Sequence, residues 1–390
     1  MFSDRTGWDL TPNALSRKQE GLRERGVPIF DLTESNPTRA GFPYPEEWFR
    51  ELSDPAVSRY EPDPLGLRSA REAIARLFAS KGAAVGPEQI LLTASTSETY
   101  SHLFRLLADP GQSVLVPQPS YPLFQYLADL SDVRPVPYPL RFQPDRGWRI
   151  DFTALESAAA GAKAVVAVHP NHPTGSALRR NELQRLVEIC RRERLALIAD
   201  EVFAEYLFAE NPDIPPTLLG PHGILVFALG GLSKFLGLPQ MKLAWTACAG
   251  PEELLRPALA RLELIADSYL SVNTPVQRAF PQWLKAAQPI QGRIRERLGA
   301  NLRTLAEKCR SGPWRLLPAD GGWNAVLRNG ALSSWEEEER WVISLLEKTE
   351  VLVHPGSFFD FDQSGHLVIS LLTDPDRWSE GIQRLVRFSA

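Results

Sequence analysis

The sequence predicts an α/β protein with a mostly parallel sheet between layers of helices and a second, smaller α+β lobe. Two observations indicate this class. Short apolar runs alternate with amphipathic helical patterns, which is the arrangement of βαβ units. From about residue 285 the pattern changes to arginine-rich helices followed by further short apolar segments. A chain of 390 residues, 44% of them hydrophobic, is long enough to form two closely packed lobes.

Five apolar runs are the candidate strands of the large sheet. Each is bounded by glycine, proline or aspartate, as buried parallel strands usually are. In chain order they cover residues 89–95, 113–118, 164–170, 195–201 and 223–230. Between the third and fourth runs, apolar residues recur at helical spacing from Leu183 to Cys190, with charged residues on the opposite face. This pattern predicts a helix that connects two parallel strands.

Composition narrows the classes of function. The 43 basic and 47 acidic side chains give a net charge of −4, which favours neither nucleic acid nor an anionic membrane as a partner. The three cysteines are widely spaced and suggest no disulfide framework or zinc ribbon. Neither a signal peptide nor a run of eighteen apolar residues is found. We therefore expect a cytoplasmic protein that acts on small molecules.

Polar segments follow the five runs where parallel strands end. They read ASTSET, PQPSYP, HPNHPTG, DEVF and GGLSKF in chain order. Ligands of open parallel sheets bind at the carboxyl ends of the strands, so we expect these segments to meet around one site. The last segment carries Lys234, an amine placed directly after an apolar run and Ser233.

In these segments the sequence resembles the class I and II aminotransferases, which are pyridoxal-phosphate (PLP) enzymes of fold type I. The order and spacing of the motifs carry the resemblance, which extends over nearly the whole chain. The motifs are YEPDPLGLRSAREAIA (60–75), PSYP (119–122), NHPTG (171–175), ADEVF (199–203), LSKFLGLPQMKLAW (232–245) and VHPGSFF (353–359).

The resemblance implies a domain organisation and an assembly. A large PLP-binding domain with a mostly parallel sheet of the seven-stranded type would cover residues 46–284. Residues 1–45 would form an N-terminal arm and part of the small domain, which residues 285–390 complete. The family also implies a homodimer with active sites at the subunit interface.

The chemistry of the cofactor gives roles to three residues. PLP is an aldehyde held as a Schiff base by a lysine that later moves the proton at the substrate's Cα, and Lys234 matches that position. A carboxylate must keep the pyridine nitrogen protonated, and the resemblance assigns this role to Asp200. Tyr121 takes the position of the aromatic residue that stacks on the ring.

The phosphate of PLP needs amides, hydroxyls and a cation. Thr96 and Ser97 open a predicted helix, and Ser233 adds a hydroxyl. The resemblance gives the cation position to Lys242, where arginine is usual. Tyr60 resembles the tyrosine that reaches the phosphate of the partner subunit, although its spacing to the following glycine is one residue longer than usual.

The chain departs from the family pattern at three positions that concern chemistry. His172 replaces the asparagine, and Phe203 the tyrosine, that usually bind the phenolic oxygen of PLP. Val368 stands where an arginine usually binds the substrate's α-carboxylate. We therefore expect another group to bind that carboxylate. Arg39 and Arg377 are the candidates, with Ser35 of the ESNPT segment on the substrate side.

The sequence thus predicts a PLP-dependent aminotransferase that moves an amino group from an amino acid or amine to a 2-oxo acid. A PLP lyase or decarboxylase on the same scaffold is the alternative within enzymes. A regulatory module that binds PLP without catalysis is a further alternative, disfavoured because only some thirty residues precede the DLTESNPT segment. A metal site at His169 and His172 is disfavoured because no third ligand with suitable spacing accompanies them.

Overall fold

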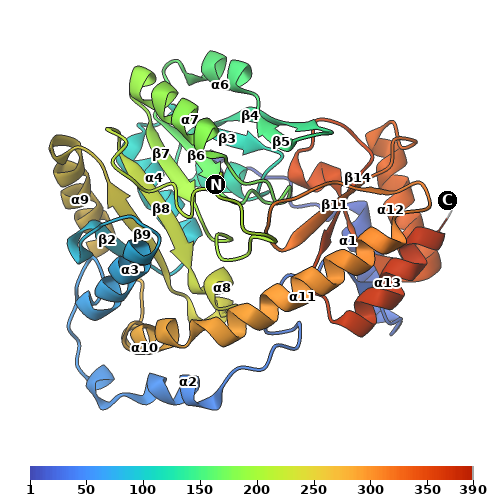
Figure 1. Cartoon of the computed structure of the whole chain (residues 1–390), viewed down its shortest axis with the longest axis horizontal. Coiled ribbons are helices and arrows are strands. Elements are labelled where there is room, and N and C mark those ends of the chain that lie inside the picture. The colour runs from blue at the N-terminus through green and yellow to red at the C-terminus, as the bar shows by residue number, and fades with distance from the viewer. Residues whose placement is uncertain (389–390) are drawn as a thin grey trace.

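The computed structural model describes residues 1–388, which form two lobes (Figure 1). The large lobe is built on an eight-stranded sheet in the order β2-β9-β8-β7-β6-β3-β4-β5. All strands run in one direction except β9 and β5, which are antiparallel to their neighbours. The strands are β2 (Ile90–Thr93), β3 (Ser113–Gln118), β4 (Arg134–Gln143), β5 (Gly147–Ile150), β6 (Ala164–Val168), β7 (Ala196–Asp200), β8 (Val226–Gly231) and β9 (Ala244–Ala249).

The five predicted apolar runs correspond to β2, β3, β6, β7 and β8. The sequence reading omitted β4, β5 and β9. In β4 the prolines at 135, 137 and 139 argue against a central strand. They are accommodated because β4 pairs with β3 on one side along residues 134–139, whereas β5 pairs only with residues 140–143. Most of β4 is therefore an edge where missing amide donors cost little.

Helices cover both faces of the sheet (Figure 1). Alternate residues of one strand face opposite layers, as the period of two requires. Val114 and Val116 of β3 pack with Leu103 of α4, whereas Leu115 packs with the layer that contains α6 and α7. The helices of this lobe are α2 (Glu46–Arg50), α3 (Arg68–Ser80), α4 (Thr96–Leu107), α5 (Phe124–Leu130), α6 (Phe152–Ala159), α7 (Arg180–Glu193), α8 (Leu232–Phe235), α9 (Glu252–Asp267) and α10 (Thr274–Lys285).

The small lobe contains a four-stranded antiparallel sheet in the order β10-β11-β14-β13. Its strands are β10 (Arg315–Leu316), β11 (Asn324–Arg328), β13 (His354–Pro355) and β14 (His366–Ser370). A two-stranded parallel pair joins β1 (Phe30–Asp31) to β12 (Val351–Leu352). Its helices are α1 (Ala14–Glu24), α11 (Ala287–Lys308), α12 (Trp335–Thr349) and α13 (Pro375–Arg387). Residues from both ends of the chain thus share this lobe.

Helix α11 connects the lobes and is the long diagonal helix of Figure 1. The Gln291 side chain donates to the carbonyl oxygen of Phe235 at 3.0 Å, beside the Lys234 segment. Further along α11, Asn301 donates to the carbonyl oxygens of Leu371 and Thr373, both at 2.8 Å. One helix therefore fixes the segment after β8 relative to the small sheet.

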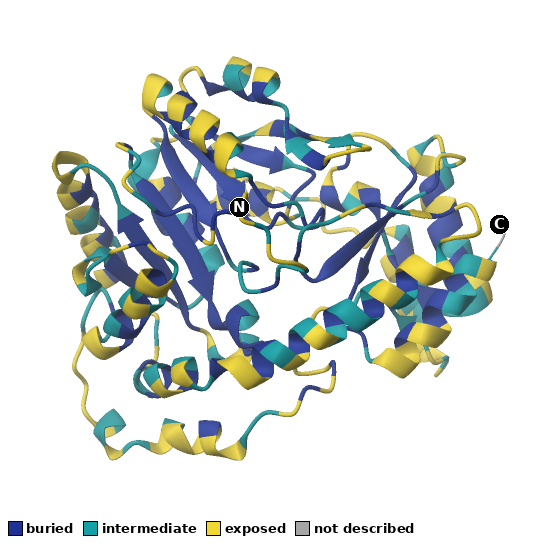
Figure 2. Ribbon diagram, in the orientation of Figure 1, coloured by how far each residue is buried: buried dark blue, intermediate teal, exposed yellow. Residues whose placement is uncertain are grey.

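Burial follows the layers. The strands of both sheets are largely buried, and the exposed residues lie on the outer faces of the helices and in loops (Figure 2). Among residues 1–388, no helix combines the length and the apolar character needed to cross a bilayer.

Candidate active site around Lys234

Lys234 lies on the short helix α8, immediately after β8 ends at Gly231. Its side chain lines a cavity at the carboxyl ends of the parallel strands, with about 1180 Å³ of empty space including the open mouth. The structure brings most of the predicted site residues into the wall of this cavity: Ser35, Thr96, Ser97, Tyr121, His172, Asp200, Phe203, Ser233 and Lys234. The polar segments after the strands therefore meet where parallel-sheet topology places them.

The amine of Lys234 has an aromatic environment. Its Nζ lies 4.9 Å from the centre of the Trp323 ring and 5.7 Å from that of Phe203. The hydroxyl of Tyr206 donates to the carbonyl oxygen of Lys234 at 2.8 Å and holds the backbone. Burial lowers the pKa of Lys234 to about 8, although the charge of Asp200 opposes the shift. The neutral amine, which is the nucleophilic form, is thus far more populated near pH 7 than in an ordinary lysine.

Asp200 ends β7 as a buried carboxylate at the cavity wall. Its Oδ2 accepts a hydrogen bond from the Tyr100 hydroxyl at 2.8 Å, and its Oδ1 accepts one from the Val202 amide at 3.2 Å. Burial raises the pKa of Asp200, and these hydrogen bonds together with the charge of Lys234 lower it. Such a carboxylate stabilises a positive charge placed beside it in the cavity.

The start of α4 gives the cavity a surface rich in donors. Ser95 is the N-cap of this helix and accepts from the Glu98 amide at 3.2 Å, and Ser95, Thr96 and Ser97 all line the cavity. The first amides of a helix have no partner within the helix, and its N-terminus favours an anion. An amine, a buried carboxylate and a hydroxyl-rich helix start in one wall match the aldehyde, the pyridine nitrogen and the phosphate of PLP, so these residues fit this cofactor.

Aromatic rings form another part of the wall. The His172 ring is stacked on Phe203, with centres 5.8 Å apart and planes at 26°, and Tyr121 meets it edge-on at 6.1 Å. Burial lowers the pKa of His172 to about 3; the nearby basic groups Lys234 and His354 add to this effect, and a hydrogen bond with the Asn324 side chain opposes it. His172 is therefore neutral near pH 7.

His169 does not belong to the cavity wall. Its Nδ1 accepts from the Leu178 amide at 3.1 Å, and its Nε2 lies 3.0 Å from the carbonyl oxygen of Pro215, to which it donates in this tautomer. Both ring nitrogens are therefore used inside the fold. Within residues 1–388, no three His, Cys, Asp or Glu side chains are grouped so that they could hold a metal ion.

Two residues with predicted roles at the phosphate lie outside this cavity. Lys242 is exposed, with a left-handed φ of 50°, in the turn before β9. Tyr60 is 79% exposed and lines a separate surface hollow with Asp63 and Gln277. Within one chain, neither side chain contributes to the wall around Lys234.

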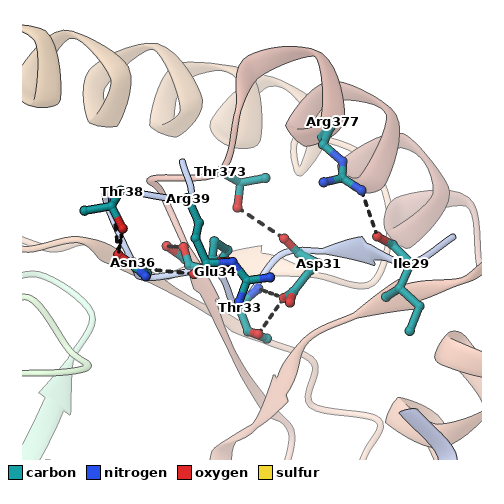
Figure 3. A network of polar contacts seen from close by, with 10 residues as sticks. Ile29, Asp31, Thr33, Glu34, Asn36, Thr38, Arg39, Thr373 and Arg377 are labelled. Atoms are coloured by element: carbon teal, nitrogen blue, oxygen red, sulfur yellow. Dashed lines mark hydrogen bonds and ion pairs between the residues drawn. The ribbon is translucent and has the colours of Figure 1, made fainter. Parts of the chain in front are cut away.

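Arg39 and Arg377 also lie elsewhere, around a second hollow between the N-terminal segment and α13 (Figure 3). The Nε of Arg39 is 3.3 Å from a carboxylate oxygen of Glu34, and its side chain is 73% exposed. Arg377 donates to the carbonyl oxygen of Ile29 at 3.3 Å. The structure therefore brings neither guanidinium to the Lys234 cavity, and it offers no support for their predicted role at the substrate carboxylate.

Sequence reasoning missed several residues of the wall, among them Tyr100, Trp323 and Asn324. A signal for Tyr100 exists, because it follows Thr96 and Ser97 by four and three residues and so shares their helix face. Trp323 and Asn324 come from the small lobe and carry no such signal. Val368 is fully buried in β14.

Comparisons with known proteins find aminotransferases. The family model "Aminotransferase class I and II" matches residues 28–385. The glutamate-pyruvate aminotransferase AlaA of Haemophilus influenzae is 28% identical over 381 residues, covering 94% of this chain and 92% of that protein. An alanine aminotransferase of Mycobacterium tuberculosis is 28% identical over 388 residues, covering 94% and 87%.

Solved structures share the fold. An alanine aminotransferase from Pyrococcus furiosus superposes with a TM-score of 0.90 at 23% identity, covering 100% of this chain and 99% of that one. An aminotransferase from Escherichia coli gives a TM-score of 0.87 at 24% identity, covering 100% and 98%.

Proposed function

Because the chain belongs to the class I and II aminotransferase family, we propose that the cavity around Lys234 is its active site. Membership confirms the predicted fold type I architecture and a PLP-dependent aminotransferase as the enzyme class. Its substrates are therefore an amino donor and a 2-oxo acid. The observation that supports this location for the site is the convergence of Lys234, Asp200 and the start of α4 on one cavity wall.

When bound, PLP supplies an aldehyde for the amino group and a ring that accepts electrons from the substrate's Cα. The proposed role of Lys234 is to hold the cofactor through its amine and to take the proton from Cα at Nζ. Its pKa of about 8 suits this transfer, because a base near the working pH is both available and strong enough. Asp200, held by Tyr100, would keep a positive charge on the pyridine nitrogen.

The remaining wall residues would orient the cofactor. In this proposal Thr96, Ser97 and Ser233 bind the phosphate, and Tyr121 stacks on the ring. His172 binds the phenolic oxygen without the help of a hydroxyl at Phe203. Lys242 would add a charge near the phosphate, although its side chain is exposed in a single chain.

The names of the relatives suggest substrates for this enzyme. We propose that the enzyme moves the amino group of L-glutamate to pyruvate, giving 2-oxoglutarate and L-alanine, and catalyses the reverse reaction with L-alanine as donor, because relatives that align along most of this chain are named alanine or glutamate-pyruvate aminotransferases. We also propose a cytoplasmic homodimer. The free cysteines are compatible with a reducing compartment, and the exposed Tyr60 is available for a partner subunit.

Absorbance spectroscopy tests the activity. The purified holoenzyme is mixed separately with L-alanine, L-glutamate and a panel of other amino acids and amines. A transaminating donor converts the cofactor to its amino form and releases one equivalent of 2-oxo acid. Continuous release of ammonia and 2-oxo acid without that conversion would instead identify a lyase and refute the proposal.

A further inference from the structure

Every α-amino acid and 2-oxo acid carries a carboxylate, yet no arginine of residues 1–388 lines the cavity around Lys234. Among the described residues, Lys234 and His172 are the basic side chains of its wall. In the proposed function Lys234 is committed to the cofactor. His172 is neutral and stacked on Phe203, where it is assigned to the ring oxygen. The group that binds the substrate carboxylate must therefore come from other residues.

The small sheet presents two such groups. In its register, Val368 of β14 lies directly between Val326 of β11 and His354 of β13, and Asn324 lies opposite Ser370. Side chains directly opposite in antiparallel strands share a face, as do residues two apart in one strand. Asn324 and His354 therefore project from the same face of the small sheet, on either side of Val368.

This face is directed at the cavity and the large lobe. Asn324 is itself part of the cavity wall. His366, two residues before Val368 on the same strand, lies 6.2 Å from Trp148 of β5 in the large sheet. His354 lies 5.8 Å from Phe359, whose ring is in turn 5.4 Å from His172. The imidazole of His354 is thus one aromatic ring away from a residue of the wall.

The chemistry of the two side chains suits a carboxylate. Asn324 has an amide that can donate two hydrogens, and it is 8% exposed. Burial lowers the pKa of His354, while the charge of Asp31 opposes the shift. A neutral imidazole offers one N–H donor and can take up a proton when an anion binds next to it. Neither group carries the permanent charge of a guanidinium.

We propose that Asn324 and His354 together bind the carboxylate of the amino acid or 2-oxo acid substrate, in place of an arginine at Val368. This inference rests on the proposed function, because it requires a substrate that carries a carboxylate next to the reacting carbon. The two side chains come from strands on either side of β14, so the site is complete only when the small sheet is folded against the large lobe.

Two variants test the pair in the PLP-loaded enzyme. Asn324→Asp keeps the shape of the side chain but replaces donors with a negative charge, and His354→Leu removes the imidazole. Each variant should raise KM for L-alanine at least about tenfold and change kcat less than about threefold, since a charged hydrogen bond in the binding step is lost. The kcat/KM for ethylamine, which is alanine without its carboxylate, should stay within about twofold.

Two matched control variants distinguish a loss of carboxylate binding from general damage to the fold. Asn329→Asp makes the same change at a buried asparagine whose Oδ1 accepts from the Ala331 amide, a bond that aspartate can keep. His222→Leu removes a histidine whose Nε2 pairs with the Leu218 carbonyl oxygen, outside the cavity wall. Both controls should bind and convert L-alanine like the wild type.

A second measurement does not depend on turnover. Pyruvate has the carboxylate but no amine, so its binding to the PLP form can be measured by calorimetry. Its Kd should rise at least about tenfold in Asn324→Asp and His354→Leu but not in the controls. If His354→Leu fails to fold, His354→Gln takes its place and is expected to give a smaller increase, because the amide keeps a donor.

The outcomes distinguish the two proposals. Folded, PLP-loaded variants with unchanged KM for L-alanine and unchanged Kd for pyruvate would refute the carboxylate site. Equal losses with L-alanine and ethylamine would also refute it, because the damage would then be general. A wild-type enzyme that converts no amino acid would refute the proposed function, and the pyruvate titration would still decide whether the pair binds a carboxylate.

Discussion

At the residue scale, the side chains of the site depend on one another for their position and their charge. Tyr100 holds Asp200, and Asp200 and Lys234 share a buried cavity wall in which each charge affects the pKa of the other. Tyr206 fixes the backbone of Lys234 through its carbonyl oxygen. The reactive amine therefore depends on residues that need not touch the substrate. Variants at these positions should change PLP binding or attachment more than they change the stability of the fold.

Lys234→Ala should abolish covalent attachment of PLP and lower turnover at least about a thousandfold, because attachment and proton transfer use the same amine. Mass spectrometry after borohydride reduction detects the attachment in the wild type and should fail to detect it in the variant. A reducible covalent adduct that persists in Lys234→Ala would assign the cofactor to another lysine.

The pKa of Lys234 leads to a pH dependence in the protein stripped of cofactor. Only the neutral amine attacks the aldehyde of added PLP, and burial lowers the pKa of this lysine to about 8. The rate of PLP attachment, followed by absorbance, should rise with pH up to about 8 and level off above it. A rate that keeps rising toward the ordinary lysine value of 10.5 would contradict this environment.

Tyr100→Phe should weaken PLP binding about tenfold, because Asp200 loses a hydrogen bond to its charged form. The control is Tyr138→Phe, which removes an equally buried hydroxyl that donates to the Val166 carbonyl oxygen at 2.7 Å, away from the cavity. The Kd for PLP can be measured by fluorescence. Equal effects of the two changes would show that Tyr100 acts only through the core.

At the scale of elements, the segment that carries β13 and β14 is held by one carboxylate of α12. The Oε1 of Glu338 accepts from the Ser357 amide at 3.1 Å, and its Oε2 accepts from the Gly365 and His366 amides at 2.6 and 3.0 Å. Glu338 is 1% exposed. Four glutamates in a row from 336 to 339 conceal it in the sequence, but its spacing to Trp341, Val342 and Leu345 places it on the apolar face of the helix.

Glu338→Ala should destabilise this segment, since three buried amides lose their acceptor at a cost of about 1–3 kcal/mol for each group left unpaired. The thermal unfolding midpoint should fall, and KM for the amino donor should rise because His354 lies on the released segment. Glu339→Ala, at an exposed position of the same helix, serves as the control. Equal midpoints for the two variants would rule out this anchoring role.

The elements that the sequence predicted are those with a strong local signal. The runs that became β3, β6 and β7 are buried on both faces, so they read as continuous apolar segments between turn residues. The prolines of β4 disguised an edge strand, and β9 was overlooked although Gly250 and Pro251 directly follow it. Local patterns report burial and turns, but they do not report which strand will lie beside which.

The same limit applies to the site. Lys234, Asp200 and the start of α4 follow strands of one parallel sheet, so topology alone gathers them. Asn324 lines the cavity and His354 shares its face of the small sheet only because of the register of β11, β14 and β13, which no local pattern encodes. The sequence instead suggested Arg39 and Arg377 as substitutes for the arginine that the family usually has at the position of Val368. The structure places both of them around a different hollow.

At the scale of the whole molecule, a single chain leaves the proposed phosphate site incomplete. Tyr60 lies in the segment between α2 and α3 and is 79% exposed, and Lys242 is exposed as well. Large apolar side chains at Leu264, Tyr269 and Leu270 are also exposed. A second copy of the chain that covers this region could receive Tyr60 at its own cavity, as the proposed homodimer requires.

Mixing two defective variants tests that arrangement. Lys234→Ala leaves every site without its amine, and Tyr60→Ala should weaken PLP binding in every site, so each protein alone should be nearly inactive at limiting PLP. If Tyr60 serves the partner, a heterodimer joins an intact Lys234 on one chain to an intact Tyr60 from the other and restores one of its two sites. Unfolding and refolding an equal mixture makes half of the dimers mixed, so activity should recover to roughly a quarter of the wild-type value. Sedimentation gives the dimer content of the same samples. Dimers without recovered activity would place Tyr60 at the site of its own chain, and active monomers would refute the shared site altogether.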